Sequence, residues 1–221
     1  MNHAVDTDPG ETSLAARQEF KREAIEFVKM IVWFLVLFAI LRTFVVEGYE
    51  VQGDSMAPTL TDHERILVFK LPHNLSKLWP FRGIEALKEG NIVVFDSLNE
   101  PDKRYVKRVV ARGPKRLPSN KVEAGRFGQD ASPGEAITVK FEEGKVFVND
   151  RRVEETYLPS DTPACGETCP EAWTLPPSSY YVLGDNRPVS KDSRSFGAVD
   201  DDHVIGKAVF RFWPLGKFGP L

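Results

Sequence analysis

The sequence has few cysteines, no excess of basic residues and none of the common phosphate-binding or zinc-binding motifs. Its 29 basic and 32 acidic side chains give a net charge of -3 and are mixed along the chain. No basic stripe is available for phosphate contacts, which excludes nucleic acid as a partner. The phosphate loops, the zinc-helix motifs and the Gly-x-Ser-x-Gly elbow are missing, since position 57 is Ala57. The sequence therefore predicts no metal ion and no cofactor.

The two cysteines, Cys165 and Cys169, lie four residues apart in a loop rich in Gly, Pro and Thr. This spacing suits a small disulfide in an oxidising compartment. The alternatives are a pair of free thiols and half of a zinc site. The zinc site is disfavoured because no second pair of Cys or His lies nearby in the sequence.

One long apolar run is present, from Phe27 to Val46. As a helix its 20 residues span about 30 Å, the thickness of a bilayer's hydrocarbon core. Lys29 and Arg42 lie near its two ends, where long side chains can reach the headgroups. A buried core helix is one alternative, and a removable signal is disfavoured because Leu41–Glu47 offers no small-residue cleavage site. We predict a cytoplasmic tail over 1–24, a membrane anchor over 25–46 and a main domain over 47–221.

The distribution of basic residues predicts the orientation of this anchor. Arg17, Lys21, Arg22 and Lys29 precede or begin the span, whereas only Arg65 occurs in the twenty residues after it. Basic residues favour the cytoplasmic side. The sequence thus predicts a single-pass protein of the inner (plasma) membrane with an extracytoplasmic domain in contact with membrane lipid.

The rest of the chain is predicted to be a mainly β body built from antiparallel hairpins, barrel-like in its core. Short apolar runs alternate with Gly, Pro, Asn and Asp. The predicted strands are Ile66–Phe69, Asn91–Phe95, Tyr105–Val110, Ala136–Phe141, Lys145–Val148, Tyr180–Leu183 and Lys207–Phe212. The proline-rich region 112–179 is predicted to be an inserted β-rich lobe, which leaves 47–111 and 180–221 as the core.

The segment Gly53-Asp54-Ser55-Met56-Ala57-Pro58-Thr59-Leu60 follows the apolar run closely. A serine hydroxyl becomes a good nucleophile only beside a base, and the oxyanion that it forms needs a backbone donor. Gly53 allows close backbone approach and Pro58 fixes the chain beyond, so the main-chain N–H of Ser55 could itself face the oxyanion. In isolation the same residues would be better explained as a plain turn before a strand.

Lys107, in the run Tyr105-Val106-Lys107-Arg108-Val109-Val110, is the candidate base. It must be neutral near pH 7, which requires burial to lower its pKa by about three units. In a strand Tyr105, Lys107 and Val109 share one face, so Lys107 projects among apolar neighbours.

Two alternatives to a lysine base exist. Lys107 could be an edge-strand lysine that reaches water, and a histidine could act instead. The histidines are His3, His63, His73 and His203. Of these only His63 is close to Ser55 in the sequence, eight residues later in a polar turn.

These two segments and Gly184-Asp185-Asn186-Arg187-x-x-Ser190-x-Asp192-Ser193-Arg194 together resemble the conserved boxes of bacterial type I signal peptidases. The resemblance implies a Ser/Lys serine endopeptidase that removes signal peptides from exported preproteins and works near the secretion translocon. It implies that Ser55 is the nucleophile and Lys107 the general base. It also implies that Ser190 orients the lysine amine, and that Asp192 and Arg194 form a supporting ion pair.

The sequence departs from this pattern at three points. Gly53 stands where many Gram-negative members carry a serine that assists the oxyanion hole, Pro188-Val189 replaces a polar pair, and Asn91 replaces an acidic residue.

Two rival functions are a soluble self-cleaving repressor-type Ser/Lys peptidase and a catalytically silent membrane scaffold.

Substrate choice and membrane contact are further predictions. A cleft beside Ser55 lined by Val, Ile and Phe would admit only small residues, as in an Ala-x-Ala sequence. The clusters Leu78–Phe81 and Phe212–Pro214 could enter the membrane interface, which Trp favours, or could equally be ordinary hydrophobic packing.

Overall fold

The computed structural model of the chain describes residues 9–76, 87–98, 100–116, 122–123, 136–160, 162–166, 169 and 172–221. The chain divides into two compact units, Met1–Val45 and Val46–Leu221. The predicted cluster Leu78–Phe81 lies outside the described residues.

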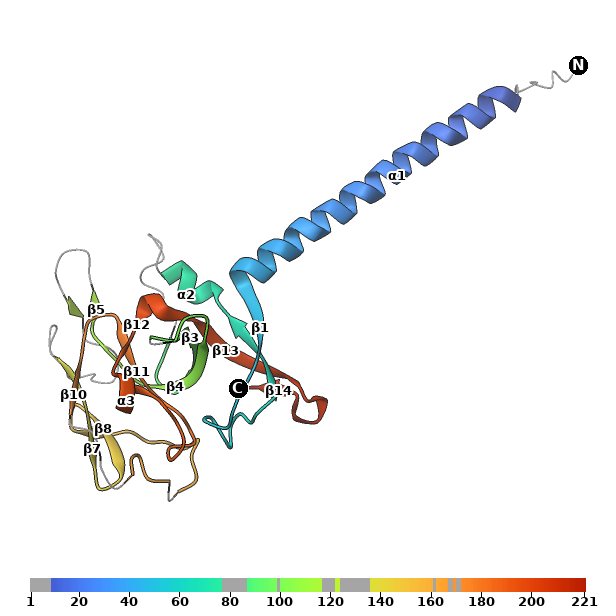
Figure 1. Cartoon of the computed structure of the whole chain (residues 1–221). Helices are drawn as coiled ribbons and strands as arrows, with labels where there is room; N and C mark the ends of the chain where they lie inside the picture. Colours follow the sequence, from blue (N-terminus) through green and yellow to red (C-terminus); the bar gives the residue numbers. More distant parts are fainter. Residues whose placement is uncertain are drawn as a thin grey trace, which may run out of the picture. The chain divides into compact units, whose positions relative to one another are not determined.

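The first unit consists of one long helix, α1 (Pro9–Ile40), which continues as a π-helical turn η1 (Leu41–Val45) (Figure 1). Its segment Phe20–Val45 is apolar and long enough to cross a membrane, and its most apolar window is not buried in protein. A helix that is apolar all round without protein cover is typical of a membrane span. The helix begins within the segment predicted as tail, because the run from Glu11 to Lys21 is rich in Ala, Glu, Arg and Lys, which favour helix.

The second unit is built on an eight-stranded antiparallel sheet (Figure 1). Its strands, in spatial order, are β1 (Val46–Glu50), β2 (Arg65–Phe69), β13 (Val204–Trp213), β3 (Ile92–Asp96), β4 (Arg104–Arg112), β11 (Ser179–Leu183) and β12 (Val199–Asp200), with β14 (Gly219–Pro220) paired to β13. Strands distant in sequence are therefore neighbours, and β4 lies between β3 and β11 in the middle of the sheet.

The segment between β4 and β11 forms separate sheets. The four-stranded one has the order β10 (Trp173–Leu175), β7 (Ile137–Glu142), β8 (Lys145–Val148) and β9 (Arg151–Arg152), and a small pair joins β5 (Lys115–Arg116) to β6 (Val122–Glu123). The hairpin between β7 and β8 turns at Glu143 and Gly144, whose φ values of 49° and 70° suit a two-residue β-turn. Cys165 and Cys169 are joined by a disulfide with a Cα–Cα distance of 5.4 Å.

Short helices complete the unit: α2 (Leu71–Ser76), α3 (Ser193–Phe196), η3 (Asp201–His203) and η4 (Leu215–Lys217). The mainly β, antiparallel architecture and the seven predicted strands are confirmed, with ends that differ by up to three residues. Strand β1 was not predicted, and Val46, assigned to the end of the membrane anchor, is its first residue. The reason is that Val-Glu-Gly-Tyr-Glu directly continues an apolar run and carries no turn signal before it.

The core explains how the sheet fixes the loop after β1. Val51, Met56 and Leu60 from this loop are buried in one apolar cluster with Ile66, Val68 and residues of β3. Strand β4 is buried over the residues 107–111. Val109 packs with Val93 and Phe95 of β3, whereas Val110 and Ala111 pack against residues of the lobe. Side chains in this part of β4 are therefore dry whichever way they point.

Candidate active site

Ser55 lies on a loop whose backbone is held from both ends. Its neighbours Met56 and Leu60 are fully buried, and the N–H of Leu60 donates to the Met56 carbonyl at 2.9 Å. From the other side Asn186 donates its main-chain N–H to the Ser55 carbonyl at 3.1 Å and its side-chain amide to the Asp54 carbonyl at 3.0 Å. The serine itself remains half-buried at the edge of a cleft, so its hydroxyl is positioned yet accessible.

Lys107 lies opposite this serine. It belongs to β4, where it pairs with Val93 of β3, and only 2% of its surface is exposed. Its Nζ lies 2.6 Å from Ser55 Oγ and donates to the Val106 carbonyl at 2.9 Å. The structure thus brings together two residues that are 52 positions apart in sequence.

Burial lowers the pKa of Lys107 to about 8, whereas the negative charges of Asp192 and Asp185 act in the opposite direction. The ring of Tyr105, 5.6 Å from Nζ, forms part of the dry surroundings. With a pKa near 8 about a tenth of the amine is neutral at pH 7 and half at pH 8. A neutral amine in hydrogen-bond contact with a hydroxyl can accept its proton.

The main-chain N–H of Ser55 has no hydrogen-bond acceptor among the described residues. It is therefore a suitable donor to an oxyanion that forms beside Oγ. Gly53 has φ 79°, a conformation that strains any residue with a side chain, and its N–H donates to Asp62 Oδ1 at 2.7 Å. The backbone at position 53 favours glycine, so this position supplies no side-chain donor to the oxyanion.

The three supporting residues implied by the resemblance follow β11: Ser190 and Asp192 precede α3, and Arg194 lies in it. Arg194 binds Asp192 through both carboxylate oxygens at 2.8 Å, and Asp192 also accepts from the Gly184 N–H at 3.0 Å. Ser190 is not hydrogen-bonded to Lys107. Its hydroxyl is buried and has no hydrogen-bond partner among the described residues. It nevertheless lies close to the dyad, because a Cβ added at Gly184 would collide with both Ser190 Oγ and the Ser55 carbonyl.

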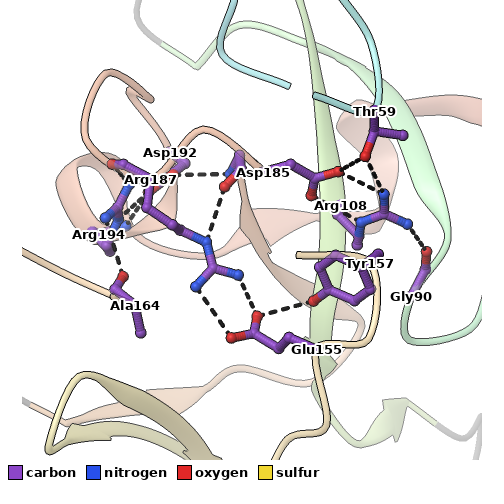
Figure 2. A network of polar contacts seen from close by, with 11 residues as sticks. Thr59, Gly90, Arg108, Glu155, Tyr157, Ala164, Asp185, Arg187, Asp192 and Arg194 are labelled. Carbon is purple, nitrogen blue, oxygen red and sulfur yellow. Dashed lines mark hydrogen bonds and ion pairs between the residues drawn. The ribbon is translucent and has the colours of Figure 1, made fainter. Parts of the chain in front are cut away.

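A buried ion pair lies on the other face of β4 (Figure 2). Arg108 binds Asp185 through two hydrogen bonds, of 2.9 Å from Nε and 2.6 Å from Nη2, and donates to the Gly90 carbonyl at 2.8 Å. Thr59 Oγ1 also donates to Asp185, at 2.5 Å. Since Arg108 follows Lys107 and Thr59 follows the Ser55 loop, this network ties the two chain segments of the dyad to one carboxylate.

Sequence reasoning missed the residues that the lobe contributes to this network. The Tyr157 ring lies 4.0 Å from the Arg108 guanidinium, and its hydroxyl donates to Glu155 at 2.9 Å. Glu155 forms an ion pair with Arg187, which is itself buried (Figure 2). The signal in the sequence was a pair of arginines, Arg108 and Arg187, one in each of two motifs. Buried arginines need carboxylate partners, and these motifs supply too few of them.

The cleft beside Ser55 and Lys107 has a volume of about 690 Å³. Val51, Ile66, Val94 and Val106 give its inner part an apolar lining, and charged residues of the β3–β4 hairpin border the rest. The described lining contains the Val and Ile that the sequence predicted, but no Phe.

Other chemistries find little support in the described part of the chain. No group of three or more metal-binding side chains occurs there. His63, the histidine nearest to Ser55 in sequence, is exposed and lies 3.1 Å from Glu50 and 3.3 Å from Asp62. The basic group in contact with the Ser55 hydroxyl is Lys107.

Comparisons with known proteins identify similar sequences and a similar solved structure. A family model described as "Signal peptidase, peptidase S26" matches residues 24–123 and 131–213. Signal peptidase IB of Staphylococcus aureus is 32% identical over 215 residues, covering 90% of this chain and 94% of the relative. Signal peptidase I of Leptolyngbya laminosa is 34% identical over 202 residues, covering 89% and 83%. A solved signal peptidase I from Enterococcus faecalis is 24% identical with a TM-score of 0.36, and covers 55% of this chain and 95% of that one.

Proposed function

Because the chain belongs to the signal peptidase family, peptidase S26, we propose that it is a membrane-anchored serine endopeptidase that removes signal peptides from exported preproteins with a Ser55–Lys107 dyad. The observation that supports the dyad is the 2.6 Å contact between Nζ of the buried Lys107 and Oγ of Ser55 at the edge of the cleft. A repressor-type peptidase would carry a DNA-binding helical domain at its N-terminus, where this chain has one apolar helix.

The reaction proceeds in two steps. Neutral Lys107 accepts the Ser55 proton while Oγ attacks the carbonyl carbon of the scissile bond, and the main-chain N–H of Ser55 stabilises the oxyanion. The ammonium then gives its proton to the departing amine, which leaves an ester on Ser55. Lys107, neutral again, accepts a proton from water, whose oxygen attacks the ester. Breakdown of this second intermediate releases the carboxylate and returns the proton to Ser55.

The cleft receives the residues that precede the scissile bond. Its walls at Val51, Ile66 and Val94 limit the side chains that fit next to Ser55 to small ones, consistent with an Ala-x-Ala preference. A substrate of this kind presents an extended, uncharged segment to the apolar part of the cleft.

The membrane completes the arrangement. We assign the span Phe20–Val45 to the inner membrane, with the tail cytoplasmic, the catalytic unit extracytoplasmic and the enzyme close to the translocon that delivers its substrates. Phe212 and Trp213 at the end of β13 are 36% and 50% exposed, and Leu215 and Phe218 nearby are exposed as well. Aromatic side chains of this kind favour the lipid interface.

Replacement of the two dyad residues tests the proposal. Ser55→Ala and Lys107→Ala should each lower the rate of preprotein processing by roughly 10³-fold or more, because neither residue works without the other. Processing by purified protein in detergent is the measurement, and His63→Ala is the control that should retain the parent rate. If both dyad variants processed preprotein as fast as the parent, the dyad assignment would be wrong, and a parent that processed no preprotein would instead favour a silent scaffold.

A further inference from the structure

A second hollow borders the Ser55 loop and shares no described lining residue with the cleft. This groove has a volume of about 760 Å³. Ala57 and Pro58 form one wall, the turn Asp185–Pro188 forms another, and the lobe closes it with Pro159, Ser160, Thr162 and Pro163. It therefore begins two residues after Ser55, on the same loop.

The loop Asp54–Pro58 separates the two hollows. Asn186, which lines the groove, is the residue that holds this loop through its bonds to the Asp54 and Ser55 carbonyls. A peptide bound across Ser55 has residues on both sides of the scissile carbonyl. If the cleft holds the residues before the scissile carbonyl, the residues after it must pass the loop Asp54–Pro58. The groove adjoins the side of this loop that faces away from the cleft.

The described lining of the groove is uncharged toward the space it encloses. Asp185 and Arg187 are its only described charged residues, and both are buried with 2% of their surface exposed. Asp185 is bound by Arg108, and Arg187 by Glu155 (Figure 2). What remains accessible is four proline rings, the Ala57 methyl group, the Asn186 amide and the hydroxyls of Ser160 and Thr162.

We propose that this groove binds the first residues after the scissile bond, the N-terminus of the mature protein, and that it prefers uncharged residues there. The inference rests on the proposed function and deepens it, because it assigns the leaving-group side of the same site. The proline rings supply apolar contact without main-chain donors. The groove therefore recognises the size and charge of the substrate side chains, and the substrate main chain does not pair with the groove as an added strand.

Two substrates with the same acyl part separate this groove from the dyad. One is a peptide with several mature residues after the scissile bond, and the other carries an aminomethylcoumarin leaving group with no residue beyond it. In Ser160→Trp, which places an indole at the exposed rim, the ratio of kcat/KM for the peptide to that for the coumarin substrate should fall about 10-fold. The matched control is Thr174→Trp, on the exposed face of β10 in the same lobe, which should leave the ratio at the parent value.

Each outcome decides one point. An unchanged ratio in Ser160→Trp, or an equal loss with both substrates, overturns the assignment of the groove to the leaving-group side. Cleavage of the coumarin substrate by Ser160→Trp also shows that the variant is folded. If the parent cleaves neither substrate, the proposed function fails, and the groove assignment fails with it.

The charge preference is tested with the parent enzyme alone. In the peptide substrate, Asp and Lys at the second mature position should each lower kcat/KM relative to Ala by about threefold or more, since the described residues of the lining offer neither charge an accessible partner. A gain with either charge would contradict the uncharged lining.

Discussion

At the scale of single residues, the contact between Lys107 and Ser55 was predictable from the joint occurrence of their two segments, although each segment alone has an ordinary structural explanation. Lys107 occupies a run in which strand alternation forces two adjacent basic residues toward opposite faces, and the structure buries both of them. Ser190 shows the limit of such reasoning. Its position was given by a motif, but the orientation of its hydroxyl depends on the backbone at Gly184, which the sequence does not specify.

The first prediction concerns pH. Because only neutral Lys107 can act as base, kcat/KM should rise with pH to a midpoint at about 8. In Asp192→Asn the midpoint should move to lower pH, since the negative charge of Asp192 raises the pKa of the amine. Initial rates between pH 5 and 10 give both midpoints.

Glu142, an exposed residue that forms an ion pair with Lys140, supplies a control for the shift of the pH midpoint. Glu142→Gln removes one negative charge far along the lobe and should leave the midpoint unchanged. A parent profile that is flat between about pH 5 and 9 would contradict a lysine base.

The second prediction concerns the stability cost of the buried lysine. The pKa of Lys107 is lower in the folded chain, about 8, than its ordinary value of 10.5, so burial of the charged form opposes folding at neutral pH. Lys107→Met should therefore raise the free energy of unfolding at pH 7 by about 2 kcal/mol while abolishing activity.

Urea unfolding across pH measures this effect. The unfolded state binds more protons between pH 8 and 10.5, so the stability of the parent should rise through this window. The advantage of the Met variant should shrink there, and a variant less stable than the parent at pH 7 would contradict the argument.

At the scale of elements, the strands were predictable wherever alternation and turn residues coincide, as at β7 and β8 around Glu143-Gly144. The segment that follows β9 was not, because Val153–Pro159 has no periodicity and its role depends on contacts with distant residues. Glu155 and Tyr157 reach Arg187 and Arg108, which belong to two different parts of the core. Such contacts follow from the tertiary structure alone.

The third prediction tests this segment. Glu155→Ala leaves Arg187, whose side chain is 1% exposed, without its carboxylate, and should lower the free energy of unfolding by roughly 3 kcal/mol. Denaturant unfolding of the purified protein measures the change. The control is Glu142→Ala, which breaks the ion pair between Glu142 and Lys140. The Glu142 side chain is 52% exposed, so this change should lower the free energy of unfolding by less than about 1 kcal/mol. Equal effects in the two variants would show that the buried pair has no special weight.

At the scale of the whole molecule, composition and the single apolar run predicted an anchor joined to a β body. The boundary could not be read to the residue, because β1 starts with Val46 in the same apolar stretch. The family assignment rests on sequence that extends over both units, from residue 24 to residue 213.

The fourth prediction is the orientation of the chain. Four basic residues precede or begin the span, so a tag fused to Met1 should be protected from protease added outside spheroplasts while the unit Val46–Leu221 is digested. Immunoblotting for the two parts before and after protease treatment gives the result. Loss of the N-terminal tag in intact spheroplasts would reverse the proposed topology.

Asn186 comes late in the sequence, yet it holds the Ser55 loop, which comes early. The serine and the lysine are both synthesised before residue 110, yet the amide that holds the Ser55 loop comes 79 positions after the lysine. A nascent polypeptide still attached to the ribosome thus carries both reactive groups without the clamp that aligns them. The two groups can therefore be held in register only after residue 186 has been made, and a shorter nascent chain lacks the aligned pair.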